Sequence, residues 1–143
     1  MITQLAHTAY RVRDLDASLA FYAKLGISEA FRLNQDDGSP WIVYLQITRD
    51  QFLELFPGAT QPIESTWESI GYHHFCLQVD DLEAAVAELV SRNVTIDRAI
   101  SLGKDNNLQA WIVDPDGNRI ELMQISPESP QAAAGAAYRS KIG

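Results

Sequence analysis

The stretch DPDGNRIELMQ, residues 114–124, decides how the chain folds. Its opening DPDG predicts a tight turn, because Pro fixes φ at one turn position and Gly accepts a positive φ at another. The residues that follow predict a strand with Ile120 and Leu122 on one face and Glu121 on the other. A carboxylate between apolar neighbours is costly to bury unless a cation or hydrogen-bond donors meet it. Glu121 is therefore the first candidate for a functional residue.

An internal repeat relates this end of the chain to its beginning. HTAYRVRDLDASLAFYAKLG, which begins at His7, is similar to HFCLQVDDLEAAVAELVSRN, which begins at His74, an offset of 67 residues. Without a gap, the same offset pairs Glu54 with Glu121. A register held over this distance predicts a tandem of two similar units.

Each unit predicts the element order β-α-β-β-β from its hydrophobic periodicity. In the first unit we expect a strand over 5–12, a helix over 15–25 with Asp14 as its N-cap, and strands over 27–33, 41–48 and 51–56. In the second we expect a strand over 72–79, a helix over 82–92, and strands over 94–100, 108–113 and 119–124. Gly26 and its counterpart Asn93 are the residue types that favour the left-handed conformation just after a helix.

The predicted fold is therefore α+β, built from two tandem βαβββ modules at about residues 4–57 and 70–125. The modules form one domain over residues 1–125, joined by an irregular linker at 58–69 that is rich in turn-forming residues. Residues 126–143 are small and punctuated by Pro and Gly, which predicts a tail with a short helical piece at Gln131–Tyr138.

Composition narrows the class of protein. A hydrophobic fraction of 46% in 143 residues is typical of a soluble globular domain. The net charge of −8 argues against nucleic acid and anionic membrane surfaces as partners, because phosphate binding requires clustered Lys and Arg. No apolar run approaches the roughly 20 residues of a membrane helix. The first residues do not resemble a signal peptide, so we expect a cytoplasmic protein.

Each predicted unit contributes a His on its first strand and a Glu on its last. These residues are His7, Glu54, His74 and Glu121. Two imidazoles and two carboxylates form a ligand set suited to Zn²⁺, Ni²⁺, Co²⁺, Fe²⁺ or Mn²⁺. If a pseudo-twofold axis relates the units, all four side chains converge on it and hold one divalent ion per site, with positions left for water or substrate.

Two further side chains flank the second His. His73 competes with His74 as the ligand, but the repeat register favours His74, and strand alternation then directs His73 to the opposite face. Cys76 is expected to share the face of His74 and to act as a small apolar filler rather than as a nucleophile. It is the only cysteine, so a disulfide framework within the chain is excluded.

These motifs together resemble the vicinal oxygen chelate superfamily. The resemblance rests on the segment from His7, the segment HHFCLQVDDLEAAV from His73, and the closing DPDGNRIELMQ, and it covers residues 5–124. This superfamily includes glyoxalase I, extradiol dioxygenases, methylmalonyl-CoA epimerase and the fosfomycin and bleomycin resistance proteins. The resemblance implies paired modules whose mixed sheets curl around a cavity, where substrates chelate a metal through adjacent oxygens.

Within the superfamily, the pattern is most similar to glyoxalase I (lactoylglutathione lyase). The resemblance implies metal ligands at His7, Glu54, His74 and Glu121, and Arg11 matches the position of a glutathione-binding arginine. From the residues alone, Arg11 is equally suited to clamp an anionic group or to pair with a carboxylate of the sheet. After Glu54 the chain reads Leu-Phe-Pro-Gly, without the Asn that glyoxalase I places there for glutathione.

The expected function is a metal-dependent lyase or isomerase of the glyoxalase I type. It acts through an enediolate on a 2-oxoaldehyde thiol adduct or a related 2-hydroxy-carbonyl compound. Glu121 is the expected catalytic base and Glu54 its partner carboxylate. Tyr44 and Trp111 occupy equivalent strand positions, where they line the cavity and contact substrate or belong to the core.

Three alternatives remain open. An epimerase or sugar-type isomerase would use the same enediolate chemistry. An extradiol dioxygenase is less favoured, because its iron takes two His and one carboxylate and a fourth ligand would crowd the open positions. A non-catalytic drug-binding resistance protein would need no metal. In each case we expect a small-molecule ligand and a homodimer, as the resemblance implies.

Overall fold

The computed structural model describes residues 2–62, 66 and 68–142. The elements in chain order are β1 (His7–Val12), α1 (Leu15–Lys24), β2 (Ser28–Asn34), β3 (Pro40–Thr48), β4 (Gln51–Pro57), β5 (Phe75–Gln78), α2 (Leu82–Ser91), β6 (Ile96–Leu102), β7 (Leu108–Val113), β8 (Arg119–Gln124) and α3 (Pro130–Ile142). They form two compact units. Unit 1 contains β1–β4, α1 and the turn Asp114–Gly117, and unit 2 contains β5–β8, α2 and α3.

Each unit is built on an open four-stranded sheet of the same topology. The strand order is β1-β4-β3-β2 in unit 1 and β5-β8-β7-β6 in unit 2. In both sheets the first strand pairs in parallel with the last, and the other pairs are antiparallel. This arrangement confirms the predicted α+β fold of two tandem βαβββ modules.

The pairing of the two central strands confirms the 67-residue offset of the repeat in each sheet. Tyr44 lies opposite Glu54 in unit 1, and Trp111 lies opposite Glu121 in unit 2. On the parallel side, Glu121 lies opposite Cys76, as Glu54 lies opposite the equivalent alanine. The two glutamates therefore occupy the same place in two copies of one sheet.

The helix boundaries follow the predicted local chemistry. The carboxylate of Asp14 accepts a hydrogen bond from the backbone of α1, and Asp81 caps α2 in the same way. Gly26 and Asn93 have φ values of 78° and 59°, which confirms their left-handed conformation after each helix. The two modules thus end their helices with the same geometry.

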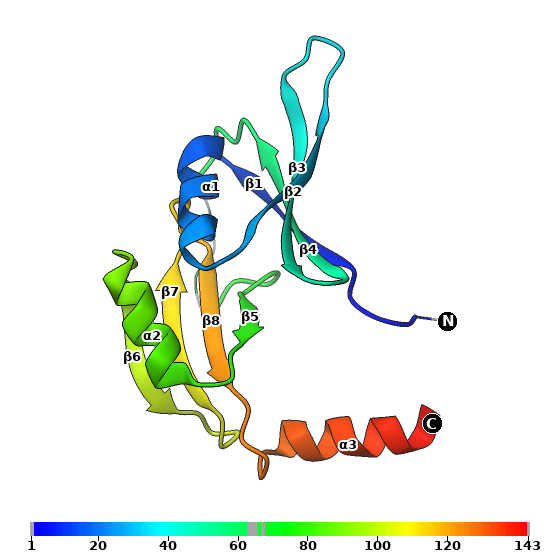
Figure 1. Cartoon of the computed structure of the whole chain (residues 1–143), viewed down its shortest axis with the longest axis vertical. Coiled ribbons are helices and arrows are strands. Elements are labelled where there is room, and N and C mark those ends of the chain that lie inside the picture. The colour runs from blue at the N-terminus through cyan, green and yellow to red at the C-terminus, as the bar shows by residue number, and fades with distance from the viewer. Residues whose placement is uncertain (1, 63–65, 67, 143) are drawn as a thin grey trace. The chain divides into compact units, whose positions relative to one another are not determined.

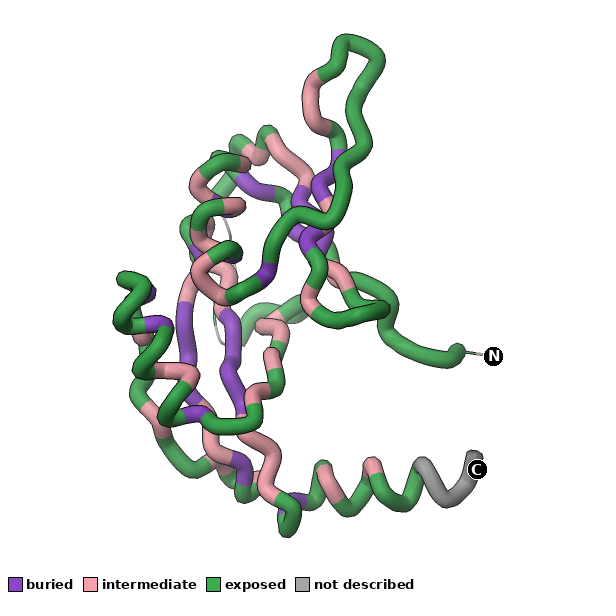
Figure 2. Tube along the Cα trace, viewed as in Figure 1, coloured by how far each residue is buried: buried purple, intermediate pink, exposed green. Residues whose placement is uncertain are grey.

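The core of each unit lies on one face of its sheet. In unit 2, Ile112, Ile120 and Leu122 are at most 2% exposed and share a face by strand alternation, while α2 lies across β6 and β7 (Figure 1). The buried residues of both units concentrate in the two central strands of each sheet (Figure 2). The opposite face carries Trp111 and Glu121.

The turn Asp114–Gly117 packs within unit 1, although the strand that follows it belongs to unit 2. Gly117 has a φ of +94°, and its N–H donates to the carbonyl of Asp114, which confirms the predicted tight turn. The buried hydroxyl of Tyr22 on α1 donates to Asp114 Oδ2 at 3.0 Å. The turn is therefore anchored to the first helix.

Most predicted element boundaries lie within two residues of the observed ones, and two elements differ by more. β5 begins at Phe75 instead of residue 72, so His73 and His74 lie in the extended segment before the strand. The helix predicted over Gln131–Tyr138 extends over Pro130–Ile142. Buried Asn107 accepts from the backbone N–H of Ser126 at 2.9 Å and holds the start of this tail.

The division into one domain over residues 1–125 with a linker at 58–69 stays a prediction. Positions 63–65 and 67 of that linker lie outside the described residues. Within the described part of the chain, no helix combines the length and the apolar character that a membrane crossing requires.

Candidate metal centre

In unit 1, the fold brings His7 and Glu54 together. His7 opens β1 and Glu54 lies in the middle of β4, its parallel neighbour, so that His7 Nδ1 is 3.5 Å from Glu54 Oε1. The Glu54 side chain is 7% exposed, whereas the imidazole is 48% exposed. The nearly buried carboxylate of Glu54 thus pairs with the solvent-accessible imidazole of His7, which lies on the outer strand of the sheet.

In unit 2, His74 and Glu121 form the equivalent pair. His74 Nε2 lies 3.1 Å from Glu121 Oε2, and the side chains are 29% and 7% exposed. Both glutamates therefore pair with the His that the repeat register assigns to them. Imidazole nitrogens and carboxylate oxygens are the donors that borderline divalent ions take, so each pair fits half of such an ion's ligand set.

His73 does not lie on the face opposite His74, which corrects the prediction. The two Nδ1 atoms are 2.6 Å apart, and His73 Nε2 lies 3.4 Å from a guanidinium nitrogen of Arg119. Alternation requires a regular strand, and this segment precedes β5. Desolvation lowers the pKa of His73, and the positive charges of His74, Arg119 and Arg98 lower it further.

Aromatic side chains surround the pair in unit 1. Phe31 stacks on Tyr44 with ring centroids 4.2 Å apart, and Phe52 meets both rings edge-on. Tyr44 also lies edge-on to His7, and a hydrogen bond to Glu54 raises the pKa of the Tyr44 hydroxyl. Phe31 is 46% exposed. This aromatic cluster gives the face beside Glu54 an apolar character.

Arginines occupy the corresponding positions in unit 2. Trp111 lies edge-on to His74 with ring centroids 4.7 Å apart, and the guanidinium carbon of Arg98 lies 6.0 Å from the Trp111 ring centroid. The offset of 67 residues pairs Arg98 with Phe31 and Arg119 with Phe52. Sequence reasoning missed both arginines, although the repeat register contained the signal.

Arg11, the remaining predicted substrate-binding residue, is exposed on β1. The burial pattern of the strand alternates, with Tyr10 and Val12 buried and His7 and Arg11 exposed, so the last two share a face. The proposed roles of Arg11, Tyr44 and Trp111 in substrate binding stay predictions.

Within each unit, the described side chains provide two of the four predicted ligands. Considered separately, neither unit gathers three His, Cys, Asp or Glu side chains into a group that could hold a metal ion. The four-ligand set of His7, Glu54, His74 and Glu121 therefore stays a prediction.

Cys76 lies opposite Glu121 in the parallel pairing of β5 with β8. It keeps part of its surface exposed, yet desolvation of the sulfur raises the pKa of the thiol to about 12, with the charge of Glu121 as a further cause. Because the thiol stays neutral near pH 8, the raised pKa agrees with the prediction that Cys76 is not a nucleophile, whereas its exposed side chain does not fill an apolar core.

We expect the metal-free protein to react with iodoacetamide at pH 8 about 10²-fold more slowly than the urea-unfolded protein does. The raised pKa reduces the thiolate fraction, and the higher intrinsic nucleophilicity of such a thiolate offsets only part of this loss. Mass spectrometry of the alkylated protein over time measures the rate at Cys76. Equal rates in the folded and unfolded protein would contradict the assignment.

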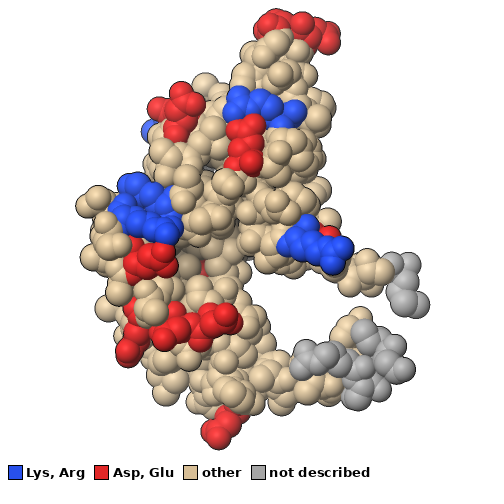
Figure 3. All heavy atoms as spheres, viewed as in Figure 1, with Lys and Arg blue, Asp and Glu red and all other residues tan. Residues whose placement is uncertain are grey.

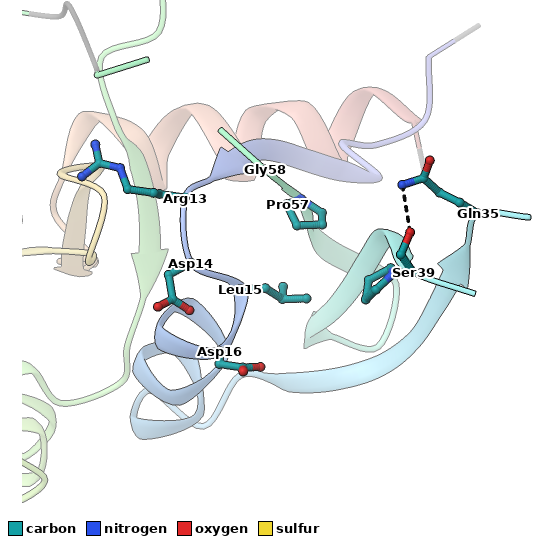
Figure 4. Close-up of a pocket in the computed structure, with 9 residues that line it drawn as sticks. Arg13, Asp14, Leu15, Asp16, Gln35, Ser39, Pro57 and Gly58 are labelled. Atoms are coloured by element: carbon teal, nitrogen blue, oxygen red, sulfur yellow. Dashed lines mark hydrogen bonds between the residues drawn. The ribbon is translucent and has the colours of Figure 1, made fainter. Parts of the chain in front are cut away.

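A separate hollow lies in unit 1, and none of the predicted site residues lines it. It has a volume of about 770 Å³ and is bordered by the start of α1 and by the β2–β3 connection, where Gln35 hydrogen-bonds to Ser39 (Figure 4). Arg13, Asp14 and Asp16 face it from the start of α1.

On the molecular face drawn in Figure 3, basic side chains form small groups beside acidic ones.

Comparison with known proteins places these modules in a family. Residues 4–122 match the Glyoxalase/Bleomycin resistance protein/Dioxygenase superfamily, and the chain belongs to it. A relative from Schizosaccharomyces pombe, named lactoylglutathione lyase, is 31% identical over 90% of this chain, which spans 50% of the relative's length. Other relatives are named methylmalonyl-CoA epimerase.

Two solved structures show the range of the family. The trypanothione-dependent glyoxalase I of Leishmania major is 26% identical, with a TM-score of 0.69 over 98% of this chain and 99% of that protein. A bleomycin-binding protein in complex with bleomycin is 28% identical, with a TM-score of 0.65 over 87% of this chain and 100% of that protein. The family therefore includes both enzymes and binding proteins.

Proposed function

We propose that this protein is a metal-dependent lyase or isomerase of the glyoxalase I type. Its substrate is a 2-oxoaldehyde thiol adduct or a related 2-hydroxy-carbonyl compound. The observation that carries the proposal is the recurrence of one His–Glu pair at equivalent register positions of two modules. The relatives named lactoylglutathione lyase support it.

The donor set assigns a role to each residue of the pairs. His7, Glu54, His74 and Glu121 would hold one divalent ion per site, which is Zn²⁺, Ni²⁺, Co²⁺, Fe²⁺ or Mn²⁺. Such an ion, when bound, supplies Lewis-acid stabilisation of the negative charge that develops on the substrate oxygens. A bound ion would also compensate the two nearly buried carboxylates of Glu54 and Glu121, whose burial is costly without an opposite charge.

Proton transfer falls to the carboxylates. Glu121 takes the proton from the carbon beside the substrate carbonyl and returns it to the neighbouring carbon of the enediolate, so that the substrate isomerises without net loss of a proton. Glu54 is the partner carboxylate, on the opposite side of the proposed metal site from Glu121. Tyr44 donates to Glu54 and holds that carboxylate in place.

Metal analysis combined with a substrate panel tests the proposal. We expect about one equivalent of a divalent ion per set of four ligands, removable by chelator. Chelation is expected to abolish isomerisation of the methylglyoxal hemithioacetals of several thiols, and re-addition of metal is expected to restore it. Sugar and acyl-CoA substrates in the same panel detect an isomerase or epimerase. A protein that takes up no metal would refute the proposal.

A second candidate function is sequestration of a planar compound without catalysis. The partly exposed aromatic cluster of Phe31, Tyr44 and Phe52 favours it, because stacked rings bind planar ligands. The resemblance to a bleomycin-binding protein points in the same direction. Tight binding of an aromatic drug by the metal-free protein, together with an inactive substrate panel, would favour this function over the enzyme.

We further propose a homodimer, as the resemblance to the superfamily implies, in which the two halves of each ligand set come either from one chain or from both. Mixing His7→Ala protein with His74→Ala protein tests where the halves come from. If each site takes one unit from each chain, mixed dimers contain one intact site and regain metal binding. If both halves come from one chain, every site carries a substitution and mixing regains nothing.

A further inference from the structure

The two modules place different chemistry at equivalent positions beside their His–Glu pairs. Unit 1 presents Phe31 and Phe52, whereas unit 2 presents Arg98 and Arg119 at the positions 67 residues later. Strand pairing confirms the equivalence for the first pair, because Phe31 lies opposite Tyr44 as Arg98 lies opposite Trp111. Two aromatic rings in one copy thus correspond to two guanidinium groups in the other.

Both arginines belong to the sheet face that carries Glu121. Arg119 lies two residues before Glu121 on β8, and Arg98 lies opposite Trp111, the cross-strand partner of Glu121. Arg119 reaches His73 at 3.4 Å, and Arg98 lies 6.0 Å from the Trp111 ring centroid. Trp111 in turn lies edge-on to His74 with ring centroids 4.7 Å apart, so both guanidinium groups lie near the segment that carries His74.

The fold itself does not require a cation at either position. The equivalent positions of unit 1 hold phenylalanine in a sheet of the same topology and register. The arginines are also placed beside a nearly buried carboxylate–imidazole pair rather than at a remote surface. A guanidinium presents a planar fork of donors that matches the oxygens of a carboxylate or a phosphate.

We infer that Arg98 and Arg119 form an anion-binding subsite of unit 2, so that the substrate carries a carboxylate or phosphate group near its two chelating oxygens. This inference rests on the proposed function for the chelating part of the substrate. It names a substrate class that the His–Glu pairs alone do not specify. Arg119 contacts His73, and the subsite therefore continues to the segment that holds His74.

Matched chelating probes test the subsite in the metal-loaded protein. Glycolohydroxamate offers the chelating oxygens alone, phosphoglycolohydroxamate adds a phosphate, and succinic acid monohydroxamate carries a carboxylate. Isothermal titration calorimetry gives the Kd of each probe. We expect at least one anionic probe to bind about tenfold more tightly than glycolohydroxamate, because charge-assisted bidentate hydrogen bonds are the stronger kind. The tighter of the two anionic probes identifies the group that the subsite recognises.

The variants Arg98→Phe and Arg119→Phe introduce the residues of the sister module. Each is expected to bring the Kd of the anionic probe close to that of glycolohydroxamate. Arg98→Lys and Arg119→Lys keep the charge without the fork, and are expected to retain part of the preference. Arg92→Phe is the matched control, because that guanidinium pairs with Glu88 on α2 and should leave all three affinities unchanged. Circular dichroism verifies that each variant is folded.

The outcomes separate the subsite from the proposed function. If glycolohydroxamate binds but neither anionic probe binds better, the subsite is refuted and the metal site stands. If the protein takes up no metal, titration of the metal-free protein with inorganic phosphate decides. Saturable phosphate binding that both Phe variants abolish would support the subsite without the lyase, and its absence in the parent protein would refute the subsite.

Discussion

Glu121→Gln is expected to lower the turnover number of the metal-loaded protein by about 10³-fold, the middle of the range that a positioned general base supplies. Gln keeps the shape of the side chain and one carbonyl oxygen that can still bind an ion. It cannot accept the proton of the substrate. The metal content of the variant should therefore fall much less than its activity. Steady-state kinetics and elemental analysis of the same preparation measure both quantities.

Two other substitutions calibrate this result. Glu54→Gln tests the partner carboxylate and is expected to reduce turnover less, because Tyr44 already donates to Glu54. Glu128→Gln removes an exposed carboxylate next to α3 and should change neither quantity. A parallel loss of metal and activity in Glu121→Gln would reduce Glu121 to a ligand without a role as a base.

Much of the fold could be predicted because local signals and the repeat agree. Asp14 and Asp81 cap the N-termini of equivalent helices, and Gly26 and Asn93 follow their C-termini. These four positions therefore predict where both helices begin and end, at the same offset of the repeat. The offset then transfers each strand of one module to the other. A residue pattern that is consistent at several levels specifies its structure strongly.

The surroundings of the candidate ligands were harder to predict. The position of His73 depends on where β5 begins, and strand ends are set by tertiary hydrogen bonding more than by local sequence. Its contact with Arg119 joins residues 46 positions apart, which no local pattern encodes. Comparison of the two modules does reveal the exchange of Phe52 for Arg119, because the register identifies equivalent positions before any contact is known.

The turn that opens the closing motif also has a structural role that its sequence did not reveal. DPDG predicted only a change of chain direction. Asp114 is 5% exposed. Its carboxylate accepts one hydrogen bond from the backbone N–H of Asp116, with a donor–acceptor distance of 2.9 Å, and another from the hydroxyl of Tyr22. Because Tyr22 lies 92 residues earlier, this contact joins two distant parts of the sequence within unit 1.

Asp114→Ala is accordingly expected to lower the free energy of unfolding by about 3 kcal/mol. The substitution removes both acceptors at once and leaves the fully buried Tyr22 hydroxyl without its carboxylate. The loss of a buried hydrogen bond to a carboxylate costs more than the loss of an exposed one, because water cannot readily replace the lost acceptor. Urea denaturation followed by circular dichroism measures the change.

Asp116→Ala is the matched control, since it removes the neighbouring carboxylate of the same turn. Its hydrogen bond with the backbone N–H of Arg13 is exposed, so the expected loss is about 1 kcal/mol or less. Tyr22→Phe should cost less than Asp114→Ala, and the double substitution less than the sum of the two, because both act on one hydrogen bond. Equal effects of the two aspartate substitutions would show that the turn conformation, rather than the buried contact with Tyr22, stabilises this region.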